Sequence, residues 1–189
     1  MCAALAGCAT YRYAGAEYHS RESAVAAARA DNDQFVAGVT PSSERIGGSL
    51  LIVVPPKLVI QQQGVVLPMG ATPPSAETID YIAELSDMRL ASMADVVRKG
   101  GAFDSVTLVH STDPENEPFG DRPYKLWLQA KFLQNQWYIS ERGSTDMQPV
   151  YMDRGLPKEQ QGNSFNASVM KALAKLRSSA GTAAASGSR

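Results

Sequence analysis

Cysteine and histidine are scarce in this chain of 189 residues, and their scarcity excludes several kinds of site. The two cysteines, Cys2 and Cys8, lie in the first eight residues, and the two histidines, His19 and His110, lie far apart. A disulfide framework is therefore excluded over the rest of the chain, as are zinc sites of the CxxC or HExxH type. We expect neither a metal nor a cofactor.

The chain also lacks an excess of charge of either sign and any long apolar run. It has 18 basic and 19 acidic residues, which argues against nucleic acid as a partner because phosphate binding needs surplus Lys and Arg on one face. Its longest dense apolar run, Leu50 to Val54, is far shorter than the ~20 residues of a membrane-spanning helix. A GxxxxGK phosphate loop and a GxSxG nucleophile elbow are also missing.

What the sequence does contain, next to its start, is the segment Leu5-Ala6-Gly7-Cys8. It resembles the lipobox of bacterial lipoproteins, in which a leucine and two small residues precede the cysteine that is acylated. The resemblance implies that Cys8 is the lipid attachment site, carrying diacylglycerol and an acyl chain such as palmitate. Residues 1–7 are then the remnant of a signal peptide, and the membrane is the first partner of the mature protein.

The residues on either side of the lipobox carry two further expectations. No basic residue precedes Cys8, whereas a signal peptide begins with a positive region and 7 to 15 apolar residues, so we expect the true start to lie upstream of Met1. The residue after the cysteine is Ala9 and not Asp. By resemblance to lipoproteins of two-membrane bacteria, this implies anchoring at the periplasmic face of the outer membrane.

We expect the rest of the chain to divide into three parts. Residues 8–19 are predicted to form a short lipidated tether, on which tyrosines pack against the domain or lie at the lipid headgroups. Residues 20–177 are predicted to form one α/β domain. Residues 178–189 are predicted to be a disordered tail, because Ala, Ser and Gly provide too little apolar bulk to fold.

Three segments have helical patterns. The first runs from Ser20 to about Ala37, the second from Glu77 to Lys99, and the third across Phe165 to Leu176. An N-cap is predicted for each helix: Ser20 for the first, Ser75 for the second and either Asn163 or Ser164 for the third. Glycines are predicted to end the first two helices, at Gly38 and Gly100. The buried faces are predicted from spacings of three and four: Val25, Ala28 and Phe35 in the first helix, and Ile79, Ile82, Ala83, Leu90, Met93, Val96 and Val97 in the second.

Strand patterns alternate with these helices. Ser49 to Val54 is apolar without alternation, which predicts a central strand buried on both faces, and Phe103 to His110 predicts a second strand. Strand, helix and strand in this order predict a parallel βαβ unit. Residues 124–132 and 136–140 predict an antiparallel hairpin, and a short strand is expected near residues 150–152. We therefore expect a mixed sheet of four to five strands with helices packed on it.

The predicted hairpin carries the only candidate contact surface. Trp127 lies on the side of Lys125 and Lys131, opposite to the apolar side of its strand, and Trp137 and Tyr138 point to opposite faces of the next strand. Rings beside Lys side chains are a possible contact patch for protein or glycan. The alternative is a sheet that is covered on both faces.

Two other groups of residues are interpreted as structural. His110, Ser111 and Asp113 are of triad type, but neighbours at a strand end point in alternating directions and cannot form a triad among themselves. Acidic residues at 113, 115 and 117 resemble the start of a calcium loop, which lacks its glycine and its terminal glutamate here. We expect a strand-end histidine and a solvated loop.

The order of elements between Ile46 and Ser140, with the helix-to-strand join from Lys99 to Val106, resembles that of small periplasmic accessory lipoproteins. Their fold is similar to the N-terminal domain of the Tol-system translocation protein. The resemblance implies protein–protein contacts in a cell-envelope complex for secretion, transport or cell-wall assembly, and no enzymatic activity. Two alternatives stay open, a lipid-anchored hydrolase with an unrecognised site and a carrier of a small apolar ligand.

Overall fold

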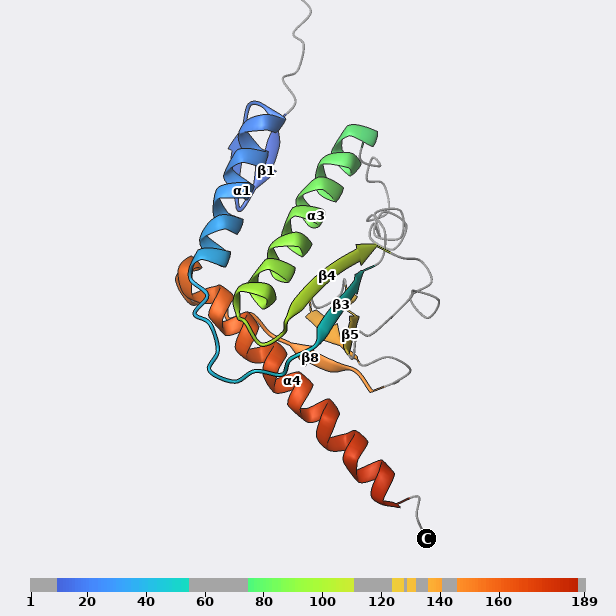
Figure 1. Cartoon of the computed structure of the whole chain (residues 1–189). Helices are drawn as coiled ribbons and strands as arrows, with labels where there is room; N and C mark the ends of the chain where they lie inside the picture. Colours follow the sequence, from blue (N-terminus) through green and yellow to red (C-terminus); the bar gives the residue numbers. More distant parts are fainter. Residues whose placement is uncertain are drawn as a thin grey trace, which may run out of the picture.

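The computed structural model describes residues 10–54, 75–110, 124–127, 129–131, 136–140 and 146–186 (Figure 1). These residues form three helices, which are α1 (Arg21–Ala37), α3 (Ala76–Lys99) and α4 (Lys158–Ser186). They also form eight strands, which are β1 (Tyr11–Tyr13), β2 (Ala16–Tyr18), β3 (Ser49–Val54), β4 (Ser105–His110), β5 (Tyr124–Trp127), β6 (Gln129–Lys131), β7 (Gln136–Ile139) and β8 (Gln148–Val150). The predicted α/β class is confirmed.

Helices α1 and α3 begin at their predicted caps. The backbone N–H of Ser23 donates to Ser20 Oγ at 3.2 Å, and that of Thr78 donates to Ser75 Oγ at 3.2 Å, so each cap satisfies a free amide of the first turn. Helix α3 is continuous through residues 86 and 87, where the sequence allowed a break. Its buried face differs from the prediction near the start of the helix: Tyr81 is buried, whereas Ile79 is half-buried and Ile82 is 50% exposed.

The predicted βαβ unit is present. Strand β3 pairs in parallel with β4, in a register that joins Ser49 to Ser105 and Val54 to His110, and α3 connects the two strands. Leu50 to Val54 are all at most 1% exposed, as the unbroken apolar run predicted. Leu50, Ile52 and Val54 point to the helices, whereas Leu51 and Val53 point to the opposite face, where they meet Val109.

The predicted hairpin is divided between two sheets. Strand β5 pairs with β3 in parallel, which gives one sheet in the order β4-β3-β5. Strands β6 and β7 form a short antiparallel pair, and β8 continues it on the other side of β7. The single sheet of four to five strands was therefore wrong in detail, since the described strands form two sheets of three and one of two. Pro149 lies in β8, an edge strand, where its missing N–H is tolerated.

Residues 11–18 are folded, although they were predicted as part of a tether. Strands β1 and β2 pair antiparallel around Ala14 and Gly15, which both have positive φ. The hairpin packs on α1 and on α3: Tyr11 stacks edge-on against Tyr81, with ring centres 5.1 Å apart, and Tyr81 Oη donates to the Arg12 carbonyl at 3.2 Å. The prediction that the tyrosines pack against the domain is correct for this ring.

Helix α4 is longer at both ends than its pattern predicted. It begins after Pro157, and its backbone stays helical to Ser186, nine residues into the segment that the sequence predicted as a tail. Asn163 and Ser164, the predicted caps, lie inside the helix and bind neighbouring segments. Asn163 Nδ2 donates to the Gly38 carbonyl at 2.7 Å and closes the end of α1, and Ser164 Oγ accepts from the Asp153 amide at 3.1 Å.

One core joins these elements. Figure 1 shows α1 and α3 side by side, with α4 crossing their lower ends. Phe35 of α1 meets Phe165 of α4 with ring centres 6.1 Å apart, and both side chains are at most 1% exposed. Ile139 of β7 and Val150 of β8 complete the same cluster. The α1, α3 and α4 junction also forms the floor of the site described next.

Candidate functional site

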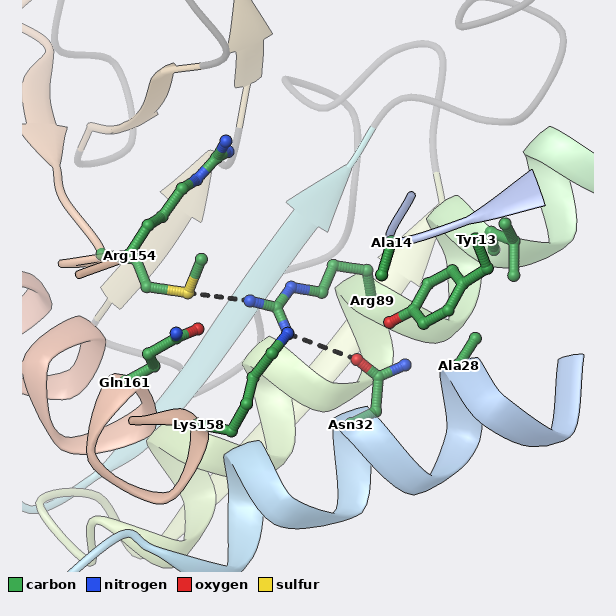
Figure 2. A pocket seen from close by; sticks show the side chains of 10 residues that line it. Tyr13, Ala14, Ala28, Asn32, Arg89, Arg154, Lys158 and Gln161 are labelled. Atoms are coloured by element: carbon green, nitrogen blue, oxygen red, sulfur yellow. Dashed lines mark hydrogen bonds between the residues drawn. The ribbon is translucent and has the colours of Figure 1, made fainter. Parts of the chain in front are cut away.

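A cleft of about 580 Å³ lies where the N-terminal hairpin meets the three helices (Figure 2). Ten described residues line it, from five segments of the chain. They are Tyr13 of β1, Ala14 of the hairpin turn, Ala28 and Asn32 of α1, Leu85 and Arg89 of α3, Met152 and Arg154 of the segment after β8, and Lys158 and Gln161 of the first turns of α4. Three of the ten are cationic, and none is acidic.

Arg89 occupies the centre of the cleft and is held on three sides. Its Nη1 donates to Asn32 Oδ1 at 3.3 Å and its Nη2 donates to Met152 Sδ at 2.8 Å, the two bonds drawn in Figure 2. Its guanidinium carbon lies 4.0 Å from the centre of the Phe35 ring, within the range of a cation–π contact. Within the described part of the chain, Arg89 forms no ion pair with a carboxylate. Its charge is therefore held by neutral groups.

The pKa of Arg89 reflects this environment. Burial lowers its pKa from the ordinary value, and the nearby charge of Arg154 acts in the same direction, against the opposing influence of Tyr13 and Asp31. Arginine nevertheless stays protonated in proteins. The shift therefore means that a permanent positive charge is kept in a partly desolvated place, at a cost in free energy.

The remaining charged groups are arranged around one carboxylate. Asp31 of α1 accepts from Tyr13 Oη at 3.0 Å and pairs with Lys158 Nζ at 2.9 Å. Burial raises the pKa of Tyr13 to about 12, with the bond to Asp31 as the next cause, so the hydroxyl stays protonated at neutral pH. Asp31 thereby ties the hairpin and the start of α4 to α1, and its charge is already shared between two partners.

The arrangement suits binding better than covalent chemistry. The ten described lining residues provide guanidinium, ammonium, amide and phenol groups, which donate hydrogen bonds to anions. They include no Ser, Thr, Cys, His, Asp or Glu, the usual nucleophiles and proton acceptors. In the part of the chain that the structure describes, no three His, Cys, Asp or Glu side chains lie close enough together to hold a metal ion.

The residues of the predicted contact patch belong to two different sheets. Lys125 and Trp127 belong to β5 of the parallel sheet, whereas Lys131 belongs to β6 and Trp137 and Tyr138 to β7 of the antiparallel sheet. Trp137 is partly buried and packs against the core cluster. This ring therefore contributes to packing, and the patch as a whole stays a prediction.

The other candidates fall into two groups. His110 is exposed at the end of β4, as expected for a strand-end histidine. Cys8, Ser111 and the acidic residues of the 113–121 loop lie outside the described residues. Among the described helices, none is long and apolar enough to cross a membrane.

Sequence reasoning missed the cleft, although one signal for it was present. Arg89 lies seven residues after Ile82 and four before Met93, on the apolar face predicted for the second helix. A cation on such a face needs a partner or a function. The other lining residues come from segments far apart in the chain, and no local pattern joins them.

Comparisons of the chain with protein-family models, with curated proteins and with solved structures give no match. The functional argument therefore depends on the residues and the geometry of this chain.

Proposed function

We propose that the protein is a lipid-anchored accessory protein of the bacterial cell envelope, on the periplasmic face of the outer membrane, that acts by binding and not by catalysis. The observation that carries the proposal is the distance between the lipobox and the fold. Strand β1 begins at Tyr11, three residues after Cys8. Three residues of extended chain span at most about 10 Å, so a lipid on Cys8 would hold the folded hairpin next to the headgroups.

A lipid on Cys8 would give the domain a defined orientation at the membrane. The hairpin is tied to α3 through Tyr11, which hydrogen-bonds to Glu77 in the first turn of that helix. The end of the domain formed by the hairpin and the start of α3 would therefore face the membrane. An accessory protein held in this way presents its other surfaces to proteins of the envelope, with little of the rotational freedom that a long tether allows.

The cleft supports a binding role over the two alternatives. A hydrolase commonly uses a Ser, Thr, Cys, His, Asp or Glu side chain as nucleophile or proton acceptor, and the ten described lining residues include none of these. The pKa of Arg89 is lowered by burial, but its guanidinium stays protonated at neutral pH and cannot act as a base. A carrier of an apolar ligand would need an apolar cavity, whereas three cations line this one.

Membrane fractionation tests the anchor, and the chain has its own matched control. The native protein should sediment with bacterial membranes and be released only by detergent, because two or three acyl chains anchor a domain stably. Cys8→Ser should move it to the soluble periplasmic fraction, while Cys2→Ser, in the segment removed on processing, should leave it in the membrane. Equal membrane association of the Cys8→Ser protein would contradict the proposal.

Purification from detergent-solubilised envelopes tests the accessory role. The anchored protein should retain the same envelope protein in repeated preparations, at a fixed ratio to the bait. Recovery of no reproducible partner would count against a role in a complex, even if the lipid were present on Cys8.

A further inference from the structure

We propose that the cleft around Arg89 binds a small organic anion, whose carboxylate or phosphate group lies among Arg89, Arg154 and Lys158. The proposal goes beyond the accessory role. It needs the cleft alone and stands whether or not Cys8 carries a lipid.

The charge of the cleft is the first argument. Three cations line it, and none of the ten described lining residues is acidic. Among the described residues, Asp31 accepts from Tyr13 and pairs with Lys158, and no ion pair joins it to Arg89. Lys158 is also the first residue of α4, where the positive end of the helix dipole adds to the potential. An anion would relieve the repulsion that Arg154 exerts on Arg89.

The rigidity of Arg89 is the second argument. Asn32, which is 6% exposed, and Met152 each accept one N–H of the guanidinium, and the centre of the Phe35 ring lies 4.0 Å from its central carbon. A guanidinium has five N–H donors in a planar fork that matches the oxygens of a carboxylate or phosphate. With two donors used to fix the fork, the others are positioned for a ligand before it arrives. Such preorganisation reduces the entropy lost on binding.

The size and the two-sided lining of the cleft indicate an organic body on the anion. The volume of about 580 Å³ lies in the range of sites for small organic ligands, well above the need of one phosphate or carboxylate group. In Figure 2, Ala14, Ala28 and Tyr13 lie on the opposite side of Arg89 from Arg154 and Gln161. A ligand with its charged group at the arginines would place a compact body against the alanines and the tyrosine ring.

Calorimetric titration of the full chain at constant ionic strength tests the site. The probes are glycerol 3-phosphate, succinate, inorganic phosphate and neutral glycerol. We expect saturable one-to-one binding of at least one of the two organic anions, weaker binding of inorganic phosphate and none of glycerol. Preference for glycerol 3-phosphate would assign the charged group as phosphate, and preference for succinate would assign it as carboxylate; either result supports the site.

Substitutions then locate the binding. Arg89→Gln removes the central charge at similar size and should weaken binding tenfold or more, the order expected for a charge-assisted hydrogen-bonded pair. Arg154→Gln and Lys158→Gln, at the rim, should each weaken it severalfold. Arg29→Gln is the matched control, since it removes one charge from an exposed position of α1 and should leave affinity unchanged.

Three results would overturn the proposal. The first is no binding of any anion at millimolar concentration. The second is binding that Arg154→Gln and Lys158→Gln leave unchanged, a test that holds even if Arg89→Gln fails to fold. The third is equal affinity for inorganic phosphate and for the organic anions, which would show that the cleft does not recognise the organic part of the ligand. None of these results bears on the lipid anchor, which the Cys8→Ser and Cys2→Ser fractions test separately.

Discussion

The central guanidinium carbon of Arg89 lies 4.0 Å from the centre of the Phe35 ring, which joins a cation of α3 to the aromatic core of α1. Phe35 is fully buried, and its ring packs against that of Phe165 of α4. The cleft is therefore built directly on the core where the three helices meet. A partly buried charge in this position lowers the stability of the fold unless a ligand compensates it, and the first prediction follows from that cost.

Arg89→Met should change the free energy of unfolding in anion-free buffer by no more than about 1 kcal/mol. A neutral side chain of similar length removes the desolvation cost of the charge, and this gain offsets the loss of the hydrogen bonds to Asn32 and Met152. Urea unfolding measures the change, with Arg29→Met as the exposed control, expected within about 0.5 kcal/mol of the native protein. A loss above about 2 kcal/mol would show that Arg89 is a structural cation.

Gly162→Ala should destabilise the protein although alanine favours helices. A Cβ at this position of α4 would lie 2.0 Å from the Phe35 carbonyl oxygen and 2.8 Å from Val39 Cγ2. Helix propensity alone predicts a gain of about 1 kcal/mol, whereas forced separation of α1 and α4 should cost about 1 to 3 kcal/mol net.

Gly155→Ala is the control for this substitution, measured by the same urea unfolding. Its Cβ would meet only Asp153 Oδ1, at 3.3 Å, a side-chain atom that can move. If Gly162→Ala were as stable as Gly155→Ala, the close approach of the two helices would be disproved.

Tyr13 should make the protein sensitive to alkali between about pH 10 and 12. Burial raises its pKa to about 12, and the bond to Asp31 adds to the effect, so the folded state holds the proton more tightly than the unfolded chain does near pH 10. This contribution to stability is complete below pH 10 and is lost as the pH rises through 12. Tyr13→Phe removes it, so the two proteins should differ in pH dependence only in this window.

Absorbance of tyrosinate at 295 nm checks the same point. The native protein should titrate one more tyrosine at high pH than Tyr13→Phe does, with a midpoint near 12. A difference spectrum with a midpoint at 10 would mean that Tyr13 is neither buried nor bonded to Asp31 in solution.

Tyr81→Phe should cost about 1 kcal/mol of stability if the N-terminal hairpin is part of the folded domain. The substitution keeps the ring that stacks on Tyr11 and removes only the hydroxyl that donates to the Arg12 carbonyl. Tyr151→Phe, at a tyrosine that is 60% exposed, serves as control and should be neutral. Equal stability of the two variants would favour a loose tether before residue 20.

Local patterns predicted the elements that depend on local chemistry. Ser20 and Ser75 indicated the starts of α1 and α3, because an N-cap depends on the type of one residue. The unbroken run from Leu50 to Val54 indicated the central strand, because a strand buried on both faces needs apolar residues at every position. The start of α4 was missed, although Pro157 precedes it and proline is favoured at helix starts.

Features that depend on tertiary pairing were not predictable in the same way. Alternation in residues 124–132 indicated strand structure, but nothing local shows that β5 pairs with β3 and that β6 pairs with β7. The N-terminal hairpin is stabilised by α1 and α3, from outside its own sequence. The cleft is the extreme case, since Tyr13, Arg89 and Lys158 meet only after the helices pack.

The central claim, that Arg89 and its neighbours hold an anion, is tested most directly by the side-chain NMR signals of the arginines. In the full chain with ¹⁵N-labelled arginine, the Nε–Hε signals are assigned by Arg89→Gln, Arg154→Gln and Arg29→Gln. Titration with succinate or glycerol 3-phosphate at constant ionic strength should shift the Arg89 and Arg154 signals along one saturable curve and leave the Arg29 signal in place. Equal drift of all three signals, or no shift of Arg89 at saturating anion, would contradict the claim.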